Sequence, residues 1–181
     1  ILRSNQKSDL SSLTWTRKRK SWKNIKMTVI SPSDWLAQRA RSSTLFGNSK
    51  VEVIPHGLDL NAYSPIEKRL AKQRLGFPLD RQVVLFGAVN AINDKRKGFH
   101  LLLTAINKLV NSPWGEKLIL VVFGSSKPEG PIDLRMKTQY LGRLSSTESL
   151  RLAYSAADVM VVASIQEAFG QTASEAMACG T

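Results

Sequence analysis

The sequence predicts an α/β protein with a doubly wound parallel sheet. Short apolar runs of strand length alternate with segments of helix length through most of the 181 residues. The apolar runs are continuous rather than alternating, which is typical of strands covered by helices on both faces. Three of these runs are followed at once by glycine, at Gly87, Gly124 and Gly142, where the missing side chain lets a ligand approach the backbone.

The amino-terminal part of the chain is basic and contains a small strand–helix–strand pattern. Ser33 supplies an N-cap signal before the helix, and Pro55-His56-Gly57 breaks the second strand. In order, the expected elements are a weak helix within 1–26, a strand at 27–30, a helix at 34–44 and a strand at 51–54.

A longer run of alternating strands and helices follows and predicts the parallel sheet. Its strands are expected at 83–86, 118–123, 140–141 and 158–163, and its helices at 65–75, 99–110, 147–156 and 172–178. In an open parallel sheet, ligands bind beyond the carboxyl ends of the strands. A site is therefore expected in the loops that follow these four strands.

The formal net charge of +12 arises mainly in the first 50 residues. Eleven basic residues between Arg3 and Lys50 are opposed only by Asp9 and Asp34. Such a basic face serves nucleic acid, an anionic membrane or phosphorylated substrates, and the plain alternative is a solvated helix face. No motif of the common nucleic-acid-binding modules is visible, so nucleic acid is not expected as a partner.

The composition argues against several classes of protein. No apolar run reaches the roughly 18 to 20 residues that a membrane-spanning helix needs, and the start of the chain lacks the apolar segment of a signal peptide. The single cysteine, Cys179, argues against an internal disulfide and a multi-cysteine zinc site, and no metal-ligand spacing appears. We therefore expect a protein of the reducing cytoplasm.

The loop after 158–163 carries the most informative chemistry. Glu167 and Glu175 lie eight positions apart, with a glycine-containing turn and a helix start between them. A helix N-terminus offers backbone N–H groups to a diphosphate, and a carboxylate accepts hydrogen bonds from vicinal hydroxyls. These are the groups that a nucleotide sugar presents. The alternative for Glu175 is structural, because Thr172-Ala173-Ser174-Glu175 also has the pattern of a capping box.

Lys97 precedes the helix expected at 99–110. A lysine there can reach phosphate as a point charge, and the alternative is an ordinary solvated loop residue. The two histidines, His56 and His100, are expected in structural or surface roles.

Four stretches form a specific pattern together. They are Val53 to Asp59 with Tyr63-Ser64-Pro65, Lys97-Gly98-Phe99 with Leu101-Leu102, Tyr154 to Val159, and Glu167 to Thr181. In this order and spacing they resemble the retaining family-4-type glycosyltransferases, the glycosyl transferases of group 1, which have the GT-B fold. The resemblance covers the chain from about Thr28 to the last residue and implies a Rossmann-like parallel sheet in an incomplete carboxyl-terminal domain.

The resemblance also implies a division of the chain. Residues 1–50 would be the end of an acceptor-binding amino-terminal domain, 51–65 the interdomain linker, and 66–181 a truncated nucleotide-sugar-binding domain. Because a GT-B active site lies between two domains, the chain by itself is expected to be inactive.

The roles of individual residues are likewise implied by the resemblance. Glu167 would be catalytic and contact the donor sugar near its reacting face, Glu175 would hold the ribose hydroxyls, and Lys97 would neutralise the leaving diphosphate. The implied donor site is completed by Phe169, Gly170, Gln171 and Thr172 at the sugar and diphosphate, Arg143 and Leu144 near the base, and Gly87. No metal or other cofactor is implied.

The implied reaction is transfer of a sugar from a nucleotide-diphosphate sugar to a glycan or lipid-linked acceptor, with retention of anomeric configuration, as in polysaccharide biosynthesis. Contact with the inner face of an anionic membrane is compatible with it. The alternative is a basic membrane- or nucleic-acid-binding module without catalytic activity. One departure concerns Ala88, which stands where relatives often carry arginine, and Arg96 is a candidate substitute.

Overall fold

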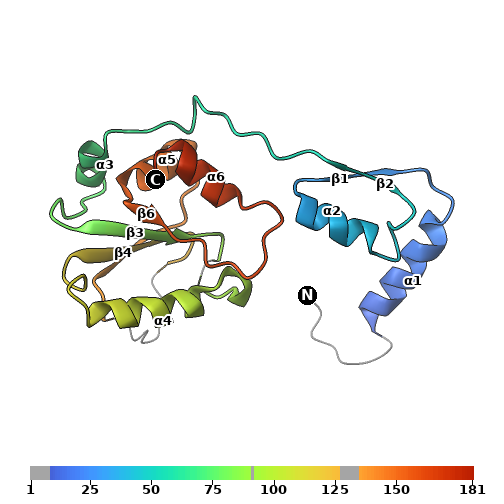
Figure 1. The fold of residues 1–181 in the computed structure, drawn as a ribbon, viewed down its shortest axis with the longest axis horizontal. Helices are drawn as coiled ribbons and strands as arrows, with labels where there is room; N and C mark the ends of the chain where they lie inside the picture. Colours follow the sequence, from blue (N-terminus) through green and yellow to red (C-terminus); the bar gives the residue numbers. More distant parts are fainter. Residues whose placement is uncertain (1–8, 91, 127–134) are drawn as a thin grey trace. The chain divides into compact units, whose positions relative to one another are not determined.

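The chain forms two compact units, Ile1–His56 and Gly57–Thr181 (Figure 1). The computed structural model describes residues 9–90, 92–126 and 135–181. The boundary between the units lies inside the segment 51–65, whose first residues belong to a strand of the first unit. In the described part of the chain, no helix has both the length and the apolar character that crossing a membrane requires.

The first unit contains a parallel strand–helix–strand arrangement. Strand β1 (Thr28–Ser31) pairs with β2 (Lys50–Val53), and α2 (Asp34–Arg41) connects them and packs against both. Ser33 caps α2, since its hydroxyl accepts a hydrogen bond from the backbone N–H of Leu36. The N-cap expected from the sequence is therefore present.

Helix α1 (Leu10–Trp22) occupies the basic segment and has no buried residue. Asp9 caps its start by accepting from the backbone N–H groups of Ser11 and Ser12. Its tryptophans contact the rest of the unit: the Trp22 ring stacks on Phe46 with 5.8 Å between ring centroids, and the Trp15 indole N–H donates to the hydroxyl of Thr44 at 3.3 Å. The predicted helix within 1–26 is confirmed for the residues that the structure describes.

The second unit contains a four-stranded parallel sheet in the order β5-β4-β3-β6. Its strands are β3 (Gln82–Gly87), β4 (Leu118–Phe123), β5 (Thr138–Gly142) and β6 (Val159–Met160). Its helices are α3 (Lys68–Arg74), the short 3-10 helix η1 (Lys95–Lys97), α4 (Phe99–Val110), α5 (Thr147–Ala156) and α6 (Gln171–Ala178). The chain leaves β3 to build β4 and β5 on one side and then crosses back to place β6 on the other.

Helices cover both faces of this sheet, as the continuous apolar strands predict (Figure 1). On one face, Val83 and Leu85 of β3 pack with residues of α3, α5 and α6. On the opposite face, Val84 and Phe86 pack with α4. Successive residues of one strand thus enter two different cores, which explains why the buried residues of β3 after Gln82 are all apolar or glycine. The doubly wound parallel sheet predicted from the sequence is confirmed.

Three elements are shorter than the sequence predicts. Helix α2 ends at Arg41 because the hydroxyls of Ser42 and Ser43 bond back to the carbonyls of Arg39 and Ala40. Helix α3 begins at Lys68 rather than at residue 65, because Glu67 acts as its N-cap. Strand β6 keeps only two residues, which pair with β3 at the edge of the sheet.

Candidate functional site

A pocket of about 1000 Å³ opens at the carboxyl end of the second unit's sheet. The segments that line it follow three different strands, and α5 and α6 close it. Its walls are residues 88–90, 92–93, 123–126 and 143–145, with Leu150 and Tyr154 of α5 and Thr172 and Glu175 of α6. Each segment therefore comes from the edge of the sheet where the sequence predicts a site.

The strand order has a topological switch point between β3 and β6. Of the segments near it, residues 88–90 and 92–93 and the α6 residues Thr172 and Glu175 line the pocket, whereas Lys97 and Glu167 do not. From β3 the chain runs outward to β4 and β5, whereas its other neighbour, β6, is reached by a crossover. The loops after β3 and β6 consequently leave neighbouring strands in opposite directions and open a crevice between them. This arrangement brings residues near 97 and near 167 together, although they are far apart in the sequence.

Glu175 lies on the pocket wall with only 6% of its surface exposed. Its Oε2 atom accepts a 2.7 Å hydrogen bond from the hydroxyl of Tyr154, which is fully buried in α5. The capping-box alternative is wrong: the N-cap of α6 is Gly170, not Thr172, and no side chain among the described residues caps this helix. The helix starts two residues earlier than a box would need, so Glu175 is free to face the pocket.

The start of α6 presents its first turn beside the same wall. Gly170 has a φ of 88°, a left-handed conformation that suits glycine, and this turns the loop into the helix. Thr172 lines the pocket, while Gln171 is exposed and does not line it. The backbone N–H groups of a first helical turn have no partner within their own helix, and they favour an anion at this end.

Lys97 and Glu167 form an ion pair. The Lys97 Nζ atom donates to Oε1 of Glu167 at 2.7 Å, and both side chains are largely shielded from solvent. Burial opposes ionisation of Glu167, but hydrogen bonds from Lys97 and Ser164 outweigh it, so the pKa of this carboxyl is lowered. At neutral pH the Glu167 carboxyl is therefore ionised. Lys97 is therefore not the solvated loop charge that was the alternative.

The loops that carry this pair are locked together by backbone contacts. The N–H of Ile165 donates to the carbonyl of Arg96 at 2.8 Å. Gly98 has a φ of 72°, and a Cβ there would stand 1.9 Å from the carbonyl oxygen of Ala163. Glycine at this position therefore permits the close approach of the loop that follows β6.

Arg96 forms an ion pair with Asp94. Its guanidinium holds both carboxylate oxygens of Asp94, at 3.1 and 2.6 Å. Hydrogen bonds from the side chain and backbone of Arg96 lower the pKa of Asp94. Ala88 lines the pocket, where it brings no charge. Arg96 is thus not poised to replace the arginine that relatives often carry at this position.

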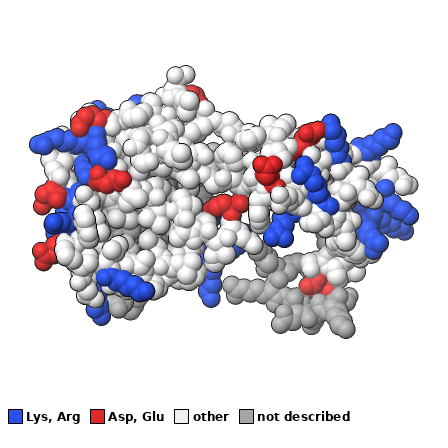
Figure 2. Space-filling model, in the orientation of Figure 1, with Lys and Arg blue, Asp and Glu red and all other residues white. Residues whose placement is uncertain are grey.

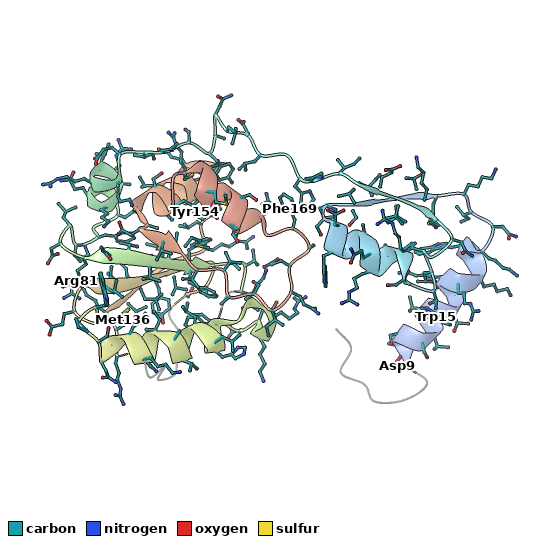
Figure 3. All side chains as sticks on the ribbon, in the orientation of Figure 1. Asp9, Trp15, Arg81, Met136, Tyr154 and Phe169 are labelled. Atoms are coloured by element: carbon teal, nitrogen blue, oxygen red, sulfur yellow. The ribbon has the colours of Figure 1, made fainter. Side chains whose placement is uncertain are left out.

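The other expected site residues are distributed unevenly. Arg143 and Leu144 line the pocket at the loop after β5. Phe169 lies on the loop that leads into α6 (Figure 3), outside the pocket lining. Gly87 is buried in β3, and the Phe123 ring fills the space that a Cβ would take, at 2.3 Å. Packing against Phe123 therefore accounts for Gly87 in this structure.

Sequence reasoning missed several residues of the pocket. Tyr154 is the most informative of these, because it belongs to the stretch from Tyr154 to Val159 but was not assigned to the site. A large aromatic side chain followed by Ser155-Ala156-Ala157 is the signal that could have revealed a buried wall residue. Ser125 and Ser126, which follow β4, are ordinary loop residues in the sequence and give no such signal.

Within residues 9–90, 92–126 and 135–181, no group of three or more His, Cys, Asp or Glu side chains could hold a metal ion.

The chain matches a known protein family. Residues 67–181 match the model of the family described as glycosyl transferases group 1. A D-inositol 3-phosphate glycosyltransferase of Segniliparus rotundus is 32% identical over 141 residues, which are 73% of this chain and 30% of that protein. A second such enzyme, from Catenulispora acidiphila, is 35% identical over 144 residues, covering 73% and 33%. The chain thus spans about a third of these relatives' length.

Solved structures share the fold over nearly the whole chain. The sucrose-phosphate synthase of Thermosynechococcus elongatus superposes with a TM-score of 0.70 and 27% identity, over 99% of this chain and 45% of that one. Anabaena HepE, solved with UDP and glucose, gives a TM-score of 0.66 at 18% identity, over 96% and 48%. The second likeness shows the fold alone.

Proposed function

Since the chain belongs to the glycosyl transferases group 1, we propose that its second unit holds the nucleotide-sugar donor of a glycosyltransferase. The observation that carries this proposal is Glu175, a nearly buried carboxylate on the wall of a pocket at the carboxyl ends of the strands. A carboxylate shielded from water needs hydrogen-bond donors. Tyr154 supplies one, and the vicinal hydroxyls of a ribose would supply the others.

The diphosphate would lie between the start of α6 and the Lys97 side chain. The first turn of α6 favours an anion, and Lys97 adds a positive charge that Glu167 holds in place. These groups stabilise a leaving diphosphate without a metal ion, so we propose metal-independent binding. The support is the position of Thr172 on the pocket wall and the short contact between the loops after β3 and β6.

Glu167 would contact the donor sugar near its reacting carbon. It lies on the loop after β6, and its lowered pKa keeps it anionic, so it can accept hydrogen bonds from sugar hydroxyls. We propose that the sugar is transferred with retention, with the leaving diphosphate close to the attacking hydroxyl of a glycan or lipid-linked acceptor. HepE was solved with UDP and glucose, which is why UDP is the first probe to use.

The basic face of the first unit would contact an anionic membrane. Arg17, Lys18, Arg19 and Lys20 are all exposed on α1, and so are Leu10 and Leu13. Figure 2 shows Lys and Arg side chains gathered over this unit with few acidic residues among them. Basic side chains exposed on one helix are attracted to the negative surface of an anionic membrane. The protein would then act as a peripheral protein at the inner face of the membrane.

A panel of UDP, ADP and GDP tests the donor site. One of them should raise the Tm of the protein and bind in calorimetry with or without EDTA. Glu175→Gln should weaken that binding by about 10-fold or more, because a hydrogen bond to a charged group contributes roughly 1.5 to 3 kcal/mol. Glu148→Gln, which changes an exposed glutamate of α5, is the matched control and should bind as the wild type does. Failure of all three nucleotides to bind would refute the proposal.

A further inference from the structure

Two tyrosines from separate segments lie at the carboxylate of Glu175. The hydroxyl of Tyr154 donates to Oε2 of Glu175 at 2.7 Å. Tyr63, which precedes α3, lies close enough that burial, followed by the charge of this carboxylate, raises the pKa of its phenol. The carboxylate of Glu175, on α6, therefore has a hydroxyl of α5 bonded to it and a second phenol, from the segment before α3, beside it.

Tyr154 can serve as a rigid donor because its ring cannot move. The Tyr154 side chain comes from α5 (Figure 3) and is fully buried, and its ring meets Phe123 edge to face, with centroids 5.7 Å apart. Burial, followed by the hydrogen bond to Glu175, raises the pKa of this phenol. The hydroxyl consequently stays protonated and donates, and Glu175 accepts.

The hydrogen bond between Tyr154 and Glu175 affects which ligands the pocket can bind. Because Tyr154 is bonded to Oε2, the Oε1 atom remains for a ligand in the pocket that Glu175 lines. A buried acceptor in a fixed position binds a ligand that donates a hydrogen bond to it more tightly than a ligand that leaves it unpaired. A mobile carboxylate would distinguish the two ligands less, since it could turn toward solvent.

We propose that Tyr154 and Tyr63 are positioning residues that fix Glu175, so that the pocket selects nucleotides with intact ribose hydroxyls. This inference rests on the proposed nucleotide site. It predicts a change in the ratio of the affinities for a ribonucleotide and for its dideoxy analogue. A general effect on folding would not change that ratio.

The experiment compares UDP with 2′,3′-dideoxy-UDP by calorimetry, or the corresponding pair for whichever of ADP and GDP binds. The wild type should prefer the ribonucleotide by about 10- to 100-fold. In Tyr154→Phe and in Tyr63→Phe this preference should fall by about 3-fold or more, with the affinity for the dideoxy analogue unchanged. Tyr140→Phe is the matched control, since this half-buried tyrosine of β5 does not line the pocket, and it should keep the wild-type ratio.

A double variant isolates the route through Glu175. In a Glu175→Gln background, Tyr154→Phe should not change the ratio further, because residues that act through one another are not additive. An additive loss would overturn the inference. If Tyr154→Phe does not fold, Tyr63→Phe, at a half-buried position, decides the question.

The outcomes separate this inference from the proposed function. If the wild type discriminates and both tyrosine variants discriminate equally well, the positioning role is wrong while the ribose site stands. If the wild type binds both nucleotides equally, the ribose assignment and the positioning role are both wrong.

Discussion

The Nζ atom of Lys97 lies 2.7 Å from Oε1 of Glu167, although 70 residues separate the two in the sequence. Lys97 follows β3 and Glu167 follows β6, and these strands are neighbours only because the chain crosses back over the sheet. The contact is therefore a direct product of the topology. It places a positive charge and a carboxylate next to the start of α6, where the proposed diphosphate and sugar meet.

Removal of this positive charge should weaken nucleotide binding. Lys97→Ala is expected to lower the affinity for UDP by about 10-fold or more, since a charge-assisted hydrogen bond contributes roughly 1.5 to 3 kcal/mol. The loss should shrink at high salt, which screens the remaining charges. Lys95→Ala changes an exposed lysine of the same 3-10 helix and should leave the affinity unchanged. Calorimetry that finds equal affinities for the two variants would show that Lys97 does not contact the nucleotide.

Gly98 should be required for the arrangement of the two loops. Gly98→Ala would place a Cβ 1.9 Å from the Ala163 carbonyl oxygen, in addition to straining a φ of 72°. Gly76→Ala is the matched control, because Gly76 has a similar φ of 66° but open space around its Cβ position. The left-handed conformation alone costs roughly 1 to 2 kcal/mol.

The free energy of unfolding in urea measures the difference. We expect Gly98→Ala to lose more stability than Gly76→Ala and to lose affinity for UDP as well, whereas Gly76→Ala should keep that affinity. Equal losses of stability and intact binding in both variants would show that the close approach at Ala163 has no importance.

Asp158 should make the stability of the second unit depend on pH. Its Oδ2 atom accepts from the backbone N–H of Val83 and from Lys72, both at 2.8 Å, and Lys68 lies 3.1 Å from Oδ1. Burial opposes its ionisation, but these partners outweigh burial and lower its pKa below the ordinary 3.8. A lowered pKa contributes stability that is full above the ordinary pKa and is lost as the pH falls through the folded-state pKa.

Asp158→Asn should therefore destabilise the protein at neutral pH by about 1.5 to 3 kcal/mol. The gap between wild type and variant should narrow below about pH 4, as the wild type also loses the charge. Urea denaturation across this pH range measures the gap, with Asp80→Asn as an exposed control of the same unit. A gap that stays constant down to about pH 2 would contradict the assigned charge interaction.

The sequence predicted the sheet well because its strands are buried on both faces. Leu118 to Phe123 contains no polar residue, and β4 occupies those six residues in the structure. The sequence was less informative about β6, which was expected over 158–163 but pairs with β3 only at Val159 and Met160. The length of this pairing depends on the neighbouring strand, which residue patterns do not encode.

Part of the site could be predicted from the local sequence around the two glutamates. Glu175 was a candidate from the glycine turn and helix start between the two glutamates, and Thr172 was implied by the family resemblance; both line the pocket. The pairing of Lys97 with Glu167, and of Tyr154 with Glu175, depends on which strands become neighbours and was not visible from spacing. The capping-box alternative failed because Gly170 starts the helix two residues before Thr172.

The basic helix α1 should bind anionic membranes. Replacing Arg17, Lys18 and Lys20 with glutamine should reduce co-sedimentation with vesicles that contain phosphatidylserine, because each basic residue near such a surface contributes about 1 kcal/mol. Binding of the wild type should rise with the anionic lipid fraction and fall with salt. The control replaces three exposed basic residues of the second unit, Arg74, Lys95 and Lys108, with glutamine. Equal wild-type binding to neutral and anionic vesicles would contradict the membrane contact.

The position of a bound nucleotide tests the central claim most directly. A crystal structure with UDP, or with whichever of ADP and GDP binds, would locate the ribose and the diphosphate. We predict that the ribose hydroxyls lie within about 3.2 Å of the Glu175 carboxylate, with the diphosphate between the start of α6 and Lys97. A nucleotide bound away from this pocket, or one whose ribose points away from Glu175, would contradict the assignment of the second unit as the donor site.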